Sequence, residues 1–218
     1  MRTWKPGHVA HLNGYLEDFA NLADGLVALY EATFERRWLE AAVELADAML
    51  ERFADADQGG FFDTSSDHES LITRPKDLSD NATPSGNAVA ADALLRLAVL
   101  TARHEYQRAA QGVFELLREP MLRYPLGFAR WLSALDFLLD KPKEIAIVGA
   151  LEAPDTQALL RVVFERYLPN KVVAGGDADI PLLEGRSARN GQATAYVCEH
   201  YMCQAPTSDP AELERLLR

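Results

Sequence analysis

The residues best suited to chemistry are acidic and lie near the starts of two predicted helices. Glu17 and Asp18 begin one of these helices, and Asp80 comes shortly before the other. Paired carboxylates are what glycoside hydrolysis requires, because one acts as the acid and the other as nucleophile or base. We therefore take Glu17, Asp18 and Asp80 as candidate catalytic residues. Sugar epimerisation would favour a histidine or tyrosine base, and these helices offer few histidines.

Further polar residues around the same helix starts could bind a ligand. They are Tyr15, Arg74, Lys76, Asp77, Ser85 and Asn87. The competing interpretation is that Asp18, Arg74 and Asp80 form a buried structural ion network, since such networks perturb charges much as catalytic sites do. Thr83 and Pro84 also suit a purely structural helix start, as N-cap and first helical residue.

The two cysteines, Cys198 and Cys203, are close in sequence, with His200 between them. They are candidates for a redox pair or for half of a metal site. Zinc would need four ligands, and thioredoxin-type chemistry prefers the spacing C-x-x-C. We expect two packed, reduced cysteines, because free cysteine is commonly buried. The remaining histidines show no ligand spacing, so no metal site and no cofactor are predicted.

Two helical patterns alternate along the first two thirds of the chain. Residues 15–34, 84–102 and 127–139 are apolar on more than one side, whereas 36–53 and 105–118 each have one apolar and one charged face. A wrapped helix followed by a half-exposed one is typical of an α/α toroid or solenoid. The irregular repeat length favours the toroid.

A long polar insertion, residues 54–83, interrupts the helices, and connections of this length are often functional. Residues 69–74 have strand character, so we expect a small β-hairpin there. We accordingly divide the chain into 1–140, helical hairpins of a toroid with this insertion, and 141–218, a small α/β tail packed on it.

The tail is predicted from a change of pattern after residue 140. Residues 144–148 and 171–174 read as strands on either side of a helix at 155–168. A third strand is expected at 195–198 and a final short helix at 210–217. The chain contains no G-x-G-x-x-G or Walker motif, so a nucleotide site is not implied.

Charge and hydropathy exclude several partners. Lys and Arg number 22 against 33 Asp and Glu, and the net charge of -11 would repel nucleic acid and anionic membranes. No apolar run approaches the length of a membrane span, and the first residues lack a signal-peptide core. The sequence therefore predicts a cytoplasmic protein.

Several runs of residues resemble a known family. They are HLNGYLEDFANLADGLVALYEATFERRWLEAA, GGFFDTSSDHESLITRPKDLSDNATPSGNAVAADALLRLA, LPNKVV and AYVCEHYMCQAP. Together they resemble the C-terminal region of the YyaL and spermatogenesis-associated protein 20 family. Members combine a thioredoxin-like domain with an α/α toroid similar to those of sugar epimerases and six-hairpin glycosidases. The resemblance implies a mainly α fold, a partial toroid with a small α/β tail.

This chain departs from that family plan in two respects. It contains no thioredoxin-like domain, and its five or so long helices cannot close a twelve-helix ring. We therefore expect self-association or a partner that completes the toroid, since helices without ring neighbours expose apolar surface. Two functions follow: binding of a carbohydrate-like small molecule at the inner-helix ends, or service as a non-catalytic scaffold or partner for a thioredoxin-like module.

Overall fold

The computed structural model describes residues 5–9, 11–69, 72–176, 180–199 and 202–218. The chain folds as two units, each formed by several segments. The helical unit comprises Met1–Ala28, Arg37–Ala98 and Arg103–Leu135. The α/β unit comprises Leu29–Arg36, Val99–Ala102 and Asp136–Arg218.

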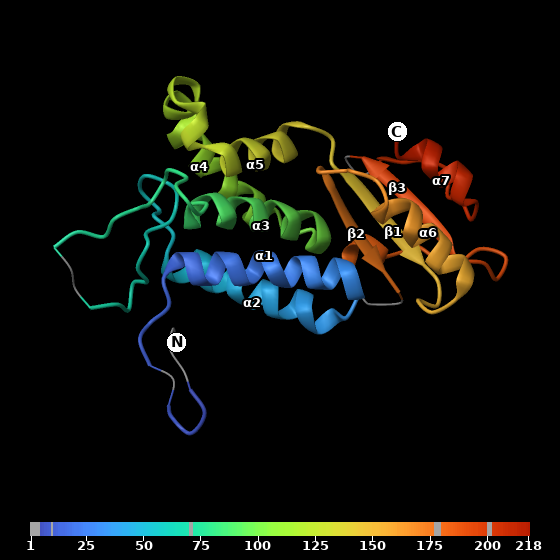
Figure 1. The fold of residues 1–218 in the computed structure, drawn as a ribbon, viewed down its shortest axis with the longest axis horizontal. Coiled ribbons are helices and arrows are strands. Elements are labelled where there is room, and N and C mark those ends of the chain that lie inside the picture. Colours follow the sequence, from blue (N-terminus) through green and yellow to red (C-terminus); the bar gives the residue numbers. More distant parts are fainter. Residues whose placement is uncertain (1–4, 10, 70–71, 177–179, 200–201) are drawn as a thin grey trace. The chain divides into compact units, whose positions relative to one another are not determined.

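All five expected long helices form, as Figure 1 shows. They are α1 (Leu16–Thr33), α2 (Arg36–Arg52), α3 (Gly86–Thr101), α4 (His104–Arg123) and α5 (Ala129–Leu139). Helix α4 extends five residues beyond its expected end and contains Pro120 in its last turn, and the 3-10 helix Pro125–Gly127 links it to α5. The chain is thus mainly α with an α/β tail.

Helix α3 is the most deeply buried element. Each residue from Ser85 to Leu95 is buried, and several of them are alanines, which let neighbouring helices approach closely. Helices α2 and α4 bury one face each, as their amphipathic patterns predict. Helix α1 differs from the expectation, because Leu22 is 56% exposed and Leu29 is 45% exposed. Its predicted burial on more than one side is wrong for that face.

The insertion at 54–83 does not form the expected β-hairpin in the residues that the structure describes. Its backbone pairing is confined to isolated bridges, Ala54 with Phe61 and Thr64 with Tyr15. Part of the expected strand, Ser70 and Leu71, lies outside the described residues. The turn before Phe61 has positive φ at Gly59 and Gly60, a conformation that glycine adopts without strain. Side-chain hydrogen bonds, described below, hold this segment instead of a strand ladder.

The α/β unit contains a four-stranded sheet in the order β2-β1-β3-β4. Its members are β1 (Lys143–Val148), β2 (Lys171–Gly175), β3 (Thr194–Glu199) and β4 (Met202–Cys203). Strand β1 pairs parallel with β2 and antiparallel with β3, so the predicted strand-helix-strand unit is confirmed. Strand β4 was not expected, since two exposed residues give no apolar pattern.

Helices complete the α/β unit around this sheet. Helix α6 (Pro154–Phe164) connects β1 to β2, and α7 (Pro210–Leu216) packs against it. Helix α6 ends four residues before its expected end, ahead of Pro169. The end of α1 also belongs to this unit: Glu31 Oε1 accepts a hydrogen bond of 2.9 Å from Val173 N on the edge strand β2.

Candidate functional site

Two of the acids predicted from the sequence brace helix ends. Asp18 Oδ2 accepts a hydrogen bond of 2.8 Å from Tyr15 N and thereby satisfies a donor at the start of α1. Asp80 accepts from Ser85 N at 2.9 Å and from Arg130 N at 2.8 Å. One carboxylate therefore joins the starts of α3 and α5. The structure gives both acids a positioning role at the helix starts.

The start of α3 also differs from its predicted form. Ser85 is the N-cap residue, because its Oγ accepts a hydrogen bond of 3.1 Å from Ala88 N. The expected N-cap, Thr83, lies two residues earlier and is exposed. Ser85 thus serves the start of the helix with its hydroxyl.

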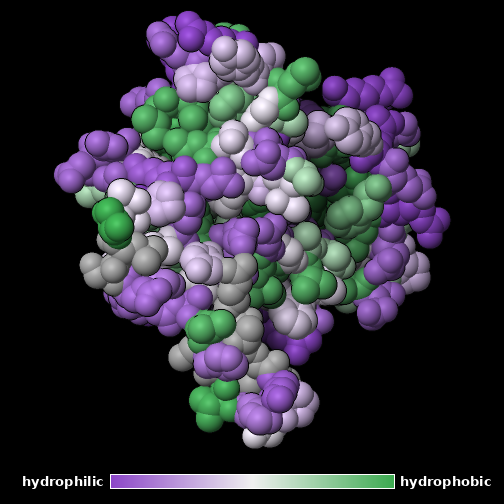
Figure 2. Space-filling model, turned by 60° about the vertical axis from the view of Figure 1, so that its left-hand side comes forward, coloured by the Kyte–Doolittle hydropathy of each residue, from purple (hydrophilic) through white to green (hydrophobic). Residues whose placement is uncertain are grey.

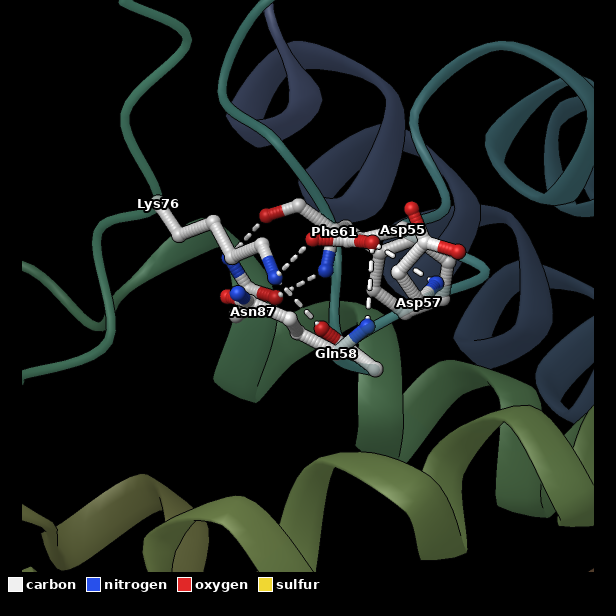
Figure 3. A network of polar contacts seen from close by, with 7 residues as sticks. Asp55, Asp57, Gln58, Phe61, Lys76 and Asn87 are labelled. Carbon is white, nitrogen blue, oxygen red and sulfur yellow. Dashed lines mark hydrogen bonds and ion pairs between the residues drawn. The ribbon is translucent and has the colours of Figure 1, made fainter.

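Asn87 fixes the insertion onto α3. Its Oδ1 accepts from Phe61 N at 2.8 Å, and its Nδ2 donates to Phe61 O at 2.9 Å and to Asp77 O at 3.1 Å. Figure 3 shows this amide facing the backbone of the 55–61 turn. The side chain is fully buried, and its amide imitates a strand neighbour for Phe61. All these bonds are internal, so Asn87 organises the site without reaching into it.

The Lys76 ammonium occupies the centre of the same turn. It lies 2.6 Å from Asp55 Oδ2 and donates to Gly59 O at 2.6 Å (Figure 3). The hydrogen bond from Lys76, with those from the Asp57 and Gln58 N–H groups, lowers the pKa of Asp55 to about 2. We call this set, Asp55, Lys76, Asn87 and the turn 57–61, the lysine network. The positive charge that balances Asp55 in this network is the Lys76 ammonium.

Arg74 is likewise engaged within the protein. Its Nη2 donates to Thr64 O at 2.6 Å and to Arg52 O at 3.3 Å, while its guanidinium stacks 4.2 Å from the centre of the Phe62 ring. Arg74 and Lys76 were both expected to bind a ligand. In the structure Arg74 ties the insertion to the end of α2 at Arg52, and Lys76 ties the later part of the insertion to its first turn.

Three other acids converge on a pocket of about 360 Å³ at the starts of α1 and α3. Glu17 comes from α1, Asp63 from the middle of the insertion and Asp77 from its later part. The acidic pocket, as we call it, is lined by Tyr15, Glu17, Asp63, Thr64, Pro75, Asp77 and Gly86. Gly86 permits the approach of α3 to α1, because a Cβ there would lie 3.0 Å from Glu17 N. The pocket contains three of the predicted site residues, Tyr15, Glu17 and Asp77.

Asp63 is the electrostatic centre of the acidic pocket. Partial burial raises its pKa, and the nearby carboxylates of Asp77 and Glu17 raise it further. A hydrogen bond from Asp77 N to Asp63 Oδ1, 2.8 Å long, acts in the opposite direction. The arrangement gives one carboxyl group, that of Asp63, which holds a proton more readily than an ordinary aspartate and lies beside two further carboxyl groups. Such a division of roles suits general acid and base chemistry.

Asp63 was not predicted as a site residue, because it is one of several acids in the same polar insertion. Nothing in their spacing separates Asp63 from Asp55 or Asp57. The available signal was its position directly after Phe61 and Phe62, of which the first is 1% exposed. A residue that follows the buried Phe61 so closely is held near the core, whereas Asp57 is exposed on the turn.

A second charged group that the sequence analysis did not single out links three helices of the helical unit. Arg130 Nη2 on α5 lies 2.7 Å from Asp92 Oδ2 on α3 and 3.1 Å from Asp24 Oδ2 on α1. Asp92 also pairs with Arg96 at 3.5 Å, one turn along α3. Burial raises the pKa of Asp24, and the charge of Arg130 opposes that shift. The opposite charges are matched, so this group supports helix packing.

The cysteine pair lies in the α/β unit, and its sulfurs are bonded. Cys198 on β3 and Cys203 on β4 form a disulfide, and the expectation of two reduced cysteines is wrong in this structure. Within the described ranges, no three His, Cys, Asp or Glu side chains are grouped so that they could hold a metal ion. No helix in the same described part of the chain is long and apolar enough to cross a membrane.

Comparison with known proteins identifies relatives of this chain. No family model matches it. Human spermatogenesis-associated protein 20 is 38% identical over 224 residues, which cover 97% of this chain and 28% of the human protein. The rat protein of the same name is 37% identical over 213 residues, covering 94% of this chain and 27% of its own length. The chain belongs to the spermatogenesis-associated protein 20 family.

Relatives in the spermatogenesis-associated protein 20 family extend well beyond this chain, which spans little more than a quarter of their length. An uncharacterized protein of Caenorhabditis elegans is 22% identical over 210 residues, again 28% of its length. The names of these relatives state no reaction. Any function for the acidic pocket must therefore be argued from its own geometry.

Proposed function

We propose that the helical unit is an arc of an α/α toroid that binds a hydroxyl-rich, sugar-like small molecule in the acidic pocket. The observation that carries the proposal is the convergence of Glu17, Asp63 and Asp77 on one cavity of about 360 Å³. That volume is of the order of ~300–1,000 Å³ typical of small-molecule sites. Carboxylate oxygens accept hydrogen bonds from hydroxyl groups, and several of them around one cavity can fix a polyol in one orientation.

The surroundings of the pocket support a defined role for each acid. Asp63, whose pKa is raised, is suited to hold a proton for transfer to a leaving oxygen. Glu17, which is exposed on the first turn of α1, is suited to act as the partner base or nucleophile. The ring of Tyr15 offers an apolar face beside them. Asp18 and Asp80 support this site by holding the helix starts that form its wall.

A panel of mono- and disaccharides added to the purified chain tests the proposal. We expect at least one sugar to raise the melting temperature in a saturable way, since a ligand that binds only the folded state stabilises it. Asp63→Asn should weaken that sugar's binding by about tenfold, the effect of losing about 1.4 kcal/mol of interaction. Asp57→Asn, an acid on the exposed turn that does not line the pocket, is the matched control.

The alternative expected from the sequence is a non-catalytic module that works beside a thioredoxin-like domain. That function requires no small molecule in the acidic pocket. A panel in which no sugar changes the melting temperature of the wild-type chain would overturn the carbohydrate proposal in favour of this one. Equal weakening by Asp63→Asn and Asp57→Asn would also contradict it, because the effect would then be one of bulk charge.

An arc of a toroid also leaves apolar residues without ring neighbours. In the helical unit, Leu22 of α1 is 56% exposed and Leu132 of α5 is 39% exposed. Figure 2 shows hydrophobic residues reaching the surface in separate patches between hydrophilic ones. We propose that self-association covers such residues, and a monodisperse monomer in light scattering would contradict it.

A further inference from the structure

The disulfide of the α/β unit combines a hidden sulfur with an accessible one. Cys198 on β3 is fully buried, whereas Cys203 on β4 is exposed. The two residues are directly paired in the β3–β4 register. A reagent approaching from solvent therefore meets Cys203 first. Attack at that sulfur would make Cys198 the leaving group.

Arg186 places its guanidinium against both sulfurs. Its Nη2 lies 3.2 Å from Cys198 Sγ and 3.5 Å from Cys203 Sγ. The same guanidinium donates to Leu182 O, and its carbon lies 5.8 Å from the centre of the Tyr196 ring. These contacts hold the charge in place, and within the described part of the chain no carboxylate pairs with the Nη2 group that faces the sulfurs. Burial lowers the Arg186 pKa, and the negative charge of Glu144 on β1 opposes that shift.

The Arg186 charge gains little from the two sulfurs while they are joined in a disulfide. Disulfide sulfurs are neutral and weak acceptors, whereas a thiolate carries a full negative charge. A cation beside a thiolate lowers the pKa of the thiol and makes that sulfur a better leaving group. Arg186 thus favours the products of reduction over the disulfide.

We propose that Cys198–Cys203 is an exchangeable disulfide that dithiols reduce in the folded protein. In the first step the thiolate of the dithiol attacks Cys203 Sγ, a mixed disulfide forms at Cys203, and Cys198 leaves as a thiolate paired with Arg186. In the second step the other thiol of the reductant, having lost its proton to water, attacks its own sulfur in the mixed disulfide. Cys203 leaves and is protonated. Two electrons pass from the dithiol, which becomes a disulfide, to the pair.

The test follows reduction of the oxidised, folded chain by dithiothreitol, with thiols alkylated and counted by mass spectrometry. We expect complete reduction while the circular dichroism spectrum stays native. Arg186→Gln should slow it by about three- to tenfold, as a poorer leaving group requires. Arg189→Gln is the matched control, because its guanidinium lies at the same 5.8 Å from the Tyr196 ring, whereas among the described residues it is Arg186 that donates to the two sulfurs. A rate for Arg186→Gln within about twofold of wild type, or reduction only on unfolding, overturns the proposal.

A second measurement keeps the proposal testable if Arg186→Gln does not fold. The wild-type chain is treated with the monothiol 2-mercaptoethanol, acid-quenched and mapped for the mixed disulfide. We expect the adduct on Cys203, the exposed sulfur. An adduct mainly on Cys198 would contradict the assigned direction of attack. This inference is independent of the acidic pocket, so sugar binding neither supports nor opposes it.

Discussion

The lysine network and the acidic pocket are built from the same insertion, yet their charges are used in opposite ways. In the network, the Asp55 carboxylate is matched by the Lys76 ammonium, and Asn87 bonds the backbone on both sides. In the pocket, Asp63 faces Asp77 and Glu17, acids of the same sign. The first arrangement is complete without a ligand. In the second, burial first and then the like charges of Asp77 and Glu17 raise the pKa of Asp63, and hydrogen bonds donated by the hydroxyl groups of a ligand would offset that cost.

This difference explains why stability and binding should separate on mutation. Residues of the lysine network hold the turn in place, so their loss should lower stability. Residues of the pocket hold unfavourable charge, so their neutralisation should cost binding and leave the fold intact.

Asn87→Ala should have the largest effect. It leaves the N–H and C=O groups of Phe61 without partners in a buried position, at about 3 kcal/mol or more in the free energy of unfolding. Urea denaturation at neutral pH measures the loss. Asn81→Ala, at an exposed position before α3, is the control and should change stability by about 0.5 kcal/mol or less. Similar losses in the free energy of unfolding for the two variants would show that Asn87 does not hold the network together.

Asp80→Ala should have the next largest effect, because one carboxylate accepts from the N–H of Ser85, the N-cap residue of α3, and also from the Arg130 N–H at the start of α5. Loss of these two hydrogen bonds costs about 1–2 kcal/mol. Sugar affinity per folded molecule should remain close to wild type. A loss of binding without a loss of stability would return Asp80 to the catalytic role first expected from the sequence.

Lys76→Met should change the acid dependence of stability. The folded-state pKa of Asp55, about 2, lies below its unfolded value of about 4, so the pair stabilises the fold above that unfolded pKa. This stabilisation declines as the pH falls from about 4 toward about 2. The variant should therefore be less stable than wild type at pH 7, and the two should converge in acid. Urea midpoints from pH 7 to pH 3 measure this, with the exposed Lys141→Met as control.

Asp63→Asn should have the smallest effect on stability and the opposite sign. Its folded-state pKa is raised, so the ionised carboxylate is disfavoured in the fold, and this cost is present above the folded pKa. An asparagine cannot ionise, and its Oδ1 can still accept from Asp77 N. At pH 7 the variant should be at least as stable as wild type while it binds sugar more weakly. A clear fall in melting temperature would show that Asp63 is structural.

Much of the fold could be predicted from the periodic spacing of apolar residues, whereas the candidate site could not. Helices α1 to α5 and the β1–α6–β2 unit were predictable because apolar spacing encodes which face is buried. The same patterns could not show which polar groups would bond to one another. Lys76 and Asp77 are adjacent in sequence, yet one side chain closes the network and the other lines the pocket. That distinction depends on where the insertion meets α3, which no local pattern records.

The hydrogen bond between Glu31 and the edge of β2 makes the α/β unit discontinuous along the chain. The unit needs the end of α1, more than 100 residues before its first strand, to occupy a backbone donor that would otherwise face outward. A fragment that begins at Asp136 would therefore carry a bare strand edge. A recombination event at residue 136 would transfer the sheet without the end of α1 that bonds its edge strand.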